Sequence, residues 1–189
     1  SKLEGENKIK KNFDRSVILK PSLVYSVDDN FTTNFMTLLN RLPIMPLYYE
    51  GKTKFAPIHV TDLVEIIINV VKGKLNERTI ECIGPEILSF KEIILKLLKA
   101  IDKKRLLIPI PLFVAKMTAK FFELMPNPLI TVDQINLLKY DNIPSGLYKT
   151  NFELNFNAKK IFDEELKKYS FNWRDGGQYS RDKVSRTNR

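Results

Sequence analysis

The side chains best suited to metal binding or covalent catalysis are scarce in this chain. Its 189 residues include one histidine, His59, and one cysteine, Cys82. A zinc site needs several His, Cys, Asp or Glu ligands at suitable spacing, and a catalytic cysteine needs a neighbour that activates its thiol. Neither pattern surrounds these two residues. We therefore interpret His59 as structural and Cys82 as a small buried hydrophobe.

Two other places in the chain have a recognisable local pattern. Lys2 begins a helix-like stretch, and Pro21-Ser22-Leu23 lies within an apolar, β-branched run over residues 16–25. Proline has a fixed φ and no backbone N–H, so it can end a strand. On the residues alone, Lys2 is a solvated lysine on a helix and Pro21 a simple strand end.

The elements that would position these residues alternate between strands and helices, which predicts an α/β fold. The run over 16–25 has the composition of a central parallel strand that is buried on both faces. Further strands are predicted over residues 55–60, 79–84 and 106–111. Residues 28–42 are predicted to form a polar loop and an amphipathic helix, and further helices are predicted over residues 62–71, 90–101, 113–125, 131–140 and 158–169.

Capping residues mark several of the helix starts. Ser89 and Glu92 form a capping box in which Leu88 and Ile93 supply a hydrophobic staple. Asp62 is predicted to cap the helix that follows it, with Glu65 as its reciprocal partner, and Gly73 to end that helix. Its body, residues 63–71, is apolar nearly all round, which predicts deep packing. Thr131 with Gln134, and Asn157, are predicted to cap the last two helices.

The net charge of +9 is concentrated at the C-terminus, because residues 167–189 hold seven basic and two acidic side chains. No nucleic-acid motif accompanies these charges, so we predict no nucleic-acid partner. A basic, aromatic tail over residues 170–189 is better suited to an acidic protein surface or to anionic lipid. No apolar run approaches the ~20 residues that span a bilayer. Peripheral membrane contact stays open, since Phe113, Met117 and neighbouring apolar residues form a stripe flanked by lysines.

Four motifs occur in an order that resembles a known group of proteins. They are Asp29-x-Phe31-x-x-x-Phe35, Phe55-Ala56-Pro57-Ile58-His59-Val60-x-Asp62, Gly84-Pro85-Glu86-x-Leu88-Ser89-x-x-Glu92 and Pro126-Asn127-Pro128-Leu129-Ile130-Thr131-x-Asp133-Gln134. Together they resemble an atypical branch of the extended short-chain dehydrogenase/reductases, which are similar to NAD-dependent epimerases and dehydratases. Within this branch they resemble the NAD(P)H-binding accessory subunits of respiratory complex I.

This resemblance implies that the chain is the C-terminal portion of a longer protein. The glycine-rich phosphate loop and the tyrosine of a Tyr-x-x-x-Lys motif would lie upstream, and Lys2 would be the motif's lysine. Such a lysine lowers the pKa of the tyrosine and holds the cofactor ribose. Pro21, Ser22 and Leu23 would lie beside the nicotinamide of NADP or NAD. Two departures weaken the case for catalysis: Lys20 replaces the usual arginine, and Ser26-Val27 replaces the usual Gly-Pro.

The implied fold is the C-terminal part of a Rossmann-type, doubly wound parallel sheet with a smaller α/β cap domain. Residues 1–27 and 58–86 would belong to the dinucleotide-binding domain. Residues 28–57 and 87–169 would form the cap on the substrate side, and residues 170–189 the basic tail. The residue that selects NAD or NADP follows the second strand of such a domain, which precedes this portion.

Three functions follow from these expectations. The favoured one is a complex I accessory protein that holds NAD(P)H structurally, so that the bound nucleotide stabilises the fold. Its partners would be complex I subunits, and it would be cytoplasmic, or peripheral on the cytoplasmic or matrix side of the respiratory membrane. The second is an active NAD(P)-dependent epimerase, dehydratase or reductase. The third is a non-enzymatic docking module that works through its tail.

Overall fold

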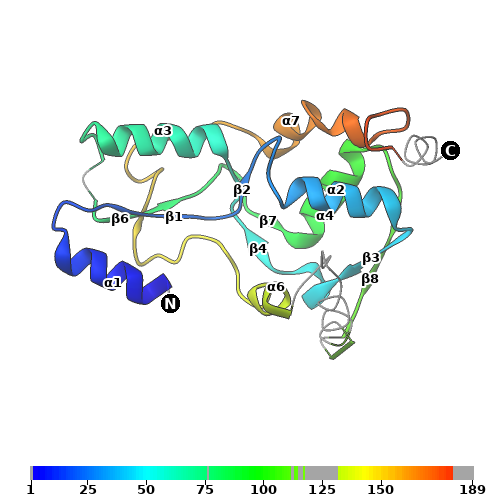
Figure 1. The fold of residues 1–189 in the computed structure, drawn as a ribbon, viewed down its shortest axis with the longest axis horizontal. Coiled ribbons are helices and arrows are strands. Elements are labelled where there is room, and N and C mark those ends of the chain that lie inside the picture. The colour runs from blue at the N-terminus through cyan, green and yellow to red at the C-terminus, as the bar shows by residue number, and fades with distance from the viewer. Residues whose placement is uncertain (1, 76, 112, 115–116, 118–131, 181–189) are drawn as a thin grey trace.

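The computed structural model describes residues 2–75, 77–111, 113–114, 117 and 132–180, with only the backbone of Lys2 and residues 132–134. Its largest sheet has three parallel strands in the order β1-β6-β9. These strands are β1 (Ile18–Pro21), β6 (Thr79–Cys82) and β9 (Lys149–Thr150). Helices α3 (Val60–Val71) and α1 (Lys2–Asn12) lie on opposite sides of β1 and β6 (Figure 1). The α/β fold class predicted from the sequence is confirmed.

Three further strand pairs connect this sheet to the rest of the molecule. Two are parallel and one is antiparallel. The parallel pairs are β2 (Val24–Tyr25) with β5 (Ile58–His59), and β3 (Ile44–Leu47) with β8 (Leu106–Pro109); the antiparallel pair is β4 (Lys54–Phe55) with β7 (Leu88–Ser89).

Buried apolar side chains form two clusters. The smaller one lies between α3 and the three-stranded sheet and contains Ile58, Ile66, Leu75, Ile80 and Cys82. The larger one is built by helices that gather on the other side of the molecule in Figure 1. These helices are α2 (Thr32–Arg41), α4 (Phe90–Ala100), α6 (Val132–Leu137) and α7 (Phe162–Lys167), with the 3₁₀ turns η1 (Tyr48–Gly51) and η2 (Ser170–Trp173).

The start of the basic C-terminal segment belongs to the larger cluster. Trp173 is 5% exposed, and its indole N–H donates to Thr37 Oγ1 on α2 at 2.9 Å. The Tyr179 ring lies against Trp173 with 4.8 Å between ring centroids. The aromatic side chains that the sequence suggested for docking are therefore partly used for internal packing. Residues 181–189 lie outside the described residues.

The strand predicted over residues 16–25 is interrupted. It forms β1 and β2, with Ser22 and Leu23 between them, because Ser22 turns away to bond other segments. Among the described strands β1 also lies at an edge of its sheet rather than at its centre. The strand predicted over 55–60 is likewise divided, into β4 and β5.

The predictions for α3 were wrong in two respects. Asp62 does not cap it; instead His59 precedes the helix, and His59 Nδ1 accepts a hydrogen bond from the Thr61 N–H at 3.3 Å. The helix is also not deeply packed, since only Asp62 and Ile66 are buried. Its outer face exposes four apolar side chains, Val64, Ile67, Ile68 and Val71. One sheet face can cover only one side of the helix, whatever the helix's composition.

The capping box of α4 is confirmed. The Glu92 N–H donates to Ser89 Oγ, and Glu92 Oε2 accepts from the Ser89 N–H at 2.7 Å. The hydrogen bonds from Ser89 lower the pKa of Glu92. Leu88 and Ile93, the predicted staple, are both buried.

We therefore expect Ser89→Ala to destabilise the protein by about 1 kcal/mol, because it removes the hydroxyl that satisfies one of the first N–H groups of α4. Urea unfolding would measure the difference. Ser89→Asp, which keeps an acceptor at the cap, is the matched control and should lose less. Equal losses for both variants would contradict a capping role.

The last helix is shorter than predicted. Residues 158–161 do not continue it, because the Asp62 carboxylate accepts from the N–H groups of Lys159 and Lys160, and Glu86 accepts from the N–H of Phe162. Asn157 is therefore not its cap. The helix predicted over 131–140 is α6, which begins at Val132 and ends at Leu137. The predicted helix over 113–125 lies largely outside the described residues.

Candidate functional site

The Pro21–Leu23 segment is held by three other parts of the chain. The Ser22 N–H donates to the carbonyl of Cys82 at 3.0 Å. Ser22 Oγ donates to the carbonyl of Asn142 at 2.6 Å and accepts from the Ala56 N–H at 3.0 Å. The Leu23 carbonyl accepts from the Ile58 N–H at 2.9 Å. A single serine thus ties the carboxyl end of β1 to two loops.

These bonds place the predicted cofactor residues differently from one another. Pro21 is exposed at the end of β1, and Ser22 is buried and used within the protein. Leu23 is half-buried and lines a cavity. Lys2 is the first residue of α1, and its side chain lies outside the described part of the structure. Its expected role therefore stays a prediction.

The cavity beside Leu23 has a volume of about 440 Å³. One wall comes from α2, which contributes Phe31, Phe35 and Leu38 at helical spacing. Phe55 of β4 and Phe90 of α4 form its floor. The Phe31 and Phe35 rings meet edge to face at 4.8 Å between centroids, and Phe35 meets Phe90 in the same way at 5.4 Å. This ring packing gives the wall a fixed shape.

The rest of the lining comes from the end of α6 and the segment after it, and from Asn30 and Asn34 around the start of α2. Leu137, Leu138 and Tyr140 add apolar surface. Four polar residues complete the lining: Asn30, Asn34, Asp141 and Asn142. In the part of the chain that the structure describes, no lysine, arginine or histidine lines the cavity. Among the lining residues that the structure describes, one is charged, Asp141, whose carboxylate accepts a hydrogen bond from the Lys54 N–H at 2.8 Å.

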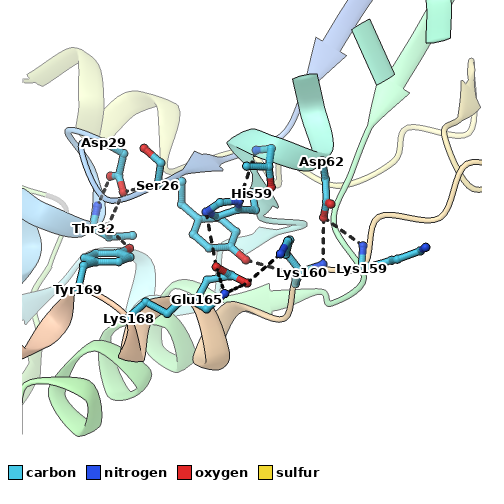
Figure 2. Close-up of polar contacts among 12 residues, drawn as sticks. Ser26, Asp29, Thr32, His59, Asp62, Lys159, Lys160, Glu165, Lys168 and Tyr169 are labelled. Carbon is cyan, nitrogen blue, oxygen red and sulfur yellow. Dashed lines mark hydrogen bonds and ion pairs between the residues drawn. The ribbon is translucent and has the colours of Figure 1, made fainter. Parts of the chain in front are cut away.

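Asp29 fixes the helix that forms the cavity wall. Its carboxylate accepts from the N–H groups of Ser26, Phe31 and Thr32, and from the Thr32 hydroxyl (Figure 2). Thr32 Oγ1 lies 2.9 Å from the buried Tyr169 hydroxyl. Asp29 therefore holds the first turn of α2, and with it the direction in which Phe31 and Phe35 project.

A second polar network lies around His59 and Glu165, as Figure 2 shows. Lys168 Nζ lies 2.7 Å from both Glu165 carboxylate oxygens, and Lys160 Nζ lies 3.6 Å from Oε1. His59 Nε2 is 3.9 Å from Oε2. The Tyr25 hydroxyl donates to the Lys160 carbonyl at 3.3 Å, and its ring meets His59 edge to face. The network joins β5 to α7.

Burial governs the ionisation of this network. It lowers the pKa of His59, an effect that the Glu165 and Asp62 charges oppose but do not overcome. Burial also works against ionised Glu165, yet the hydrogen bond from Lys168 and the charge of Lys160 lower the pKa of this carboxyl. Burial raises the pKa of Cys82 to about 12, which agrees with its interpretation as an inert hydrophobe. His59 of β5 thus contacts residues of both α3 and α7, which agrees with its interpretation as structural.

We expect stability to fall on acidification below about pH 6.5, the ordinary pKa of histidine. Below this pH the histidine of the unfolded chain binds a proton, whereas His59 in the folded protein binds it only at a lower pH because its pKa is lowered. Protonation therefore stabilises the unfolded state, and the free energy of unfolding decreases as the pH falls. Each unit of pKa depression is worth about 1.4 kcal/mol. Thermal melts between pH 7.5 and 5.5 would measure this loss.

His59→Asn is the control for this pH dependence, because asparagine can still cap α3 but does not titrate. Its melting temperature should change less over the same range. His59 is the only histidine in the chain, so no second imidazole confuses the comparison. A wild-type protein that becomes more stable on acidification would mean that an imidazolium–Glu165 ion pair dominates instead.

Sequence reasoning missed most of this site. It did not predict a role for Glu165 or Lys160, and it did not predict that Asn142 meets Ser22 across 120 positions in the chain. The spacing of residues along the sequence does not indicate contacts between residues so far apart. Phe31 and Phe35 lie four apart and therefore face the same way, but they stood out in the sequence only as part of a motif and were given no role in a site.

Among the described residues, no group of three or more His, Cys, Asp or Glu side chains could hold a metal ion. None of the helices described has both the length and the apolar character that crossing a membrane requires.

The parallel sheet with helices on both sides is a Rossmann-type arrangement, and solved structures share this fold. A dTDP-4-dehydrorhamnose reductase from Clostridium acetobutylicum matches with a TM-score of 0.54 and 18% identity, over 89% of this chain and 52% of that one. A dTDP-glucose 4,6-dehydratase from Streptomyces venezuelae, with NAD bound, matches with a TM-score of 0.56 and 14% identity. This match covers 94% of this chain and 49% of that one.

Curated sequences give a more particular similarity. The chain is 24% identical to the mitochondrial NADH dehydrogenase (ubiquinone) 1 alpha subcomplex subunit 9 of Arabidopsis thaliana, over 88% of this chain and 42% of that protein. It is also 24% identical to the Mus musculus protein of that name, over 76% of this chain and 38% of that protein. The chain thus spans less than half the length of these relatives. No protein-family profile matches it.

Proposed function

We propose that the chain is part of an NAD(P)-binding accessory subunit of respiratory NADH:ubiquinone oxidoreductase, in which the nucleotide is held mainly as a structural ligand. The observation that carries the proposal is the similarity to subunit 9 of that enzyme over 88% of the chain. The Rossmann-type fold supports it, because ligands of such sheets bind at the carboxyl ends of the strands.

The residues at that edge fit the nicotinamide side of a dinucleotide. Pro21 is exposed at the carboxyl end of β1, and the Ser22 bonds hold the backbone next to it. In this proposal Pro21, Ser22 and Leu23 position the nicotinamide, and Lys2 approaches the ribose. When bound, the cofactor could supply hydride chemistry; these residues bind and orient it. The division into residues 1–27 with 58–86, and 28–57 with 87–169, is proposed as nucleotide and cap parts.

The cavity argues against the alternative of a sugar-nucleotide enzyme. A sugar nucleotide carries a diphosphate, which proteins hold with arginine, lysine or helix N-termini. The described lining offers no cationic side chain and one carboxylate of the same sign as the ligand. Lys20 stands at the position of the usual arginine. Its ammonium lies 2.8 Å from the Glu6 carboxylate and forms an ion pair between β1 and α1.

The experiment is to isolate the protein from its native membranes on a non-denaturing gel. We expect it to migrate with NADH:ubiquinone oxidoreductase activity and to release about one NAD(P)H per copy on denaturation. The redox state of that nucleotide should not change while the complex oxidises NADH. Migration apart from the complex, together with turnover of a sugar nucleotide, would establish the enzymatic alternative instead.

A further inference from the structure

The aromatic cavity between α2, β4 and α4 has a composition that points to a ligand other than the nucleotide. Its volume of about 440 Å³ falls in the range of small-molecule sites, which are ~300–1,000 Å³. Phe31, Phe35 and Leu38 project from consecutive turns of α2, and Phe55 and Phe90 close the floor. The last two rings are 8% and 1% exposed, so the floor is apolar and belongs to the buried core.

Charge narrows the class of ligand. An anionic ligand entering the cavity would lose water without gaining a cation among the described lining residues, and it would approach the Asp141 carboxylate. A neutral molecule has no charge to desolvate and is not repelled by the Asp141 carboxylate. The amides of Asn30 and Asn34 can both donate and accept hydrogen bonds, which suits a carbonyl or hydroxyl group on the ligand.

The rings favour a flat ligand over a flexible chain. Phe31, Phe35 and Phe90 are fixed by edge-to-face contacts with one another. A planar, conjugated molecule can stack or meet edges with such rings, and it loses little conformational entropy on binding.

We propose that this cavity binds a neutral, mainly apolar small molecule with an aromatic or conjugated ring, whose carbonyl or hydroxyl group bonds Asn30 or Asn34. The body of the ligand lies against Phe31, Phe35 and Phe90. The site adjoins the nucleotide contact proposed at Pro21–Leu23, because Leu23 also lines the cavity. It does not depend on the assembly partner proposed above.

The neutral fluorophore 1-N-phenylnaphthylamine tests this proposal on the intact protein. We expect saturable binding at one site per chain. Leu38→Trp should reduce the affinity at least tenfold, because the larger side chain fills the cavity. Asn34→Trp is the second blocking variant; Asn34 is exposed one turn earlier on the same face, so this substitution does not disturb the core. Melting curves would show that both variants fold.

Val71→Trp is the control variant, since Val71 is 81% exposed on the outer face of α3. It should bind the fluorophore as the wild type does. Binding that survives both blocking variants would place the fluorophore on another apolar surface and overturn the proposal. Displacement by uridine diphosphate glucose would overturn it too, because the cavity would then serve an anionic ligand. Absence of any saturable binding would have the same consequence.

Discussion

Gly84→Ala is expected to destabilise the protein by about 3 kcal/mol, the upper end of the usual cost of overpacking. A Cβ atom at this position would lie 1.7 Å from the carbonyl oxygen of Pro57 and 2.7 Å from its carbonyl carbon. Both are backbone atoms, so no side-chain rotation can relieve the clash. The Gly84 N–H also donates to the Ala56 carbonyl at 3.2 Å, which holds the two segments together. For a chain of this size, we expect the melting temperature to fall by roughly 6–12 °C.

Gly5→Ala is the matched control, because it adds the same methyl group to a glycine with nothing within 4 Å of the new atom. Gly5 lies inside α1, where alanine is favoured over glycine by ~1 kcal/mol. We therefore expect a small gain in stability. If the two variants melted alike, the close approach of Gly84 to Pro57 would be wrong.

The parts of the fold that were predictable are those set by residues close together in sequence. Ser89 and Glu92 satisfy each other across three positions, so the start of α4 follows from the sequence alone. Strand β6 forms within the strand predicted over residues 79–84, and Gly73 adopts a positive φ just after α3. Each of these signals is complete within one turn or strand.

The incorrect predictions concern elements that depend on contacts between residues far apart in the sequence. Asp62 has the sequence of a helix cap, but its carboxylate lies where residues 159 and 160 pass, almost one hundred positions later. The same contact removes a turn from the start of the last helix. Strand β9 has only two residues and gains its identity from pairing with β6. Tertiary contacts therefore determine where these elements begin and end, and no local sequence pattern could have predicted those contacts.

The candidate site was predictable only in part. The pattern Asp29-x-Phe31-x-x-x-Phe35 stood out as part of a resemblance, and the structure adds a physical reason for it. Asp29 holds the first turn of α2, and the two phenylalanines form a cavity wall. The other walls come from β4, α4 and the segment after α6. That these segments meet depends on Ser22 and Asn142, whose contact has no sequence signal.

The second large effect is expected at Asp62. Asp62→Ala removes the acceptor for the N–H groups of Lys159 and Lys160, both at 3.0 Å, as Figure 2 shows. The carboxylate is 4% exposed, and hydrogen bonds to charged groups contribute ~1.5–3 kcal/mol each. Because water can reach parts of residues 159–160 once they are released, we expect a net loss of about 2–4 kcal/mol. Urea unfolding would measure it, with the exposed Asp28→Ala as the control.

Amide hydrogen exchange would show which role Asp62 has. If it anchors residues 158–161, exchange in Asp62→Ala should accelerate at Lys159 and Lys160, and the first turn of α3 should stay protected by His59. If Asp62 were the helix cap that its sequence suggests, exchange would accelerate at the start of α3 instead. The anchoring role has a wider consequence: α7 carries Glu165 and follows this segment, so releasing it should also loosen the network around His59.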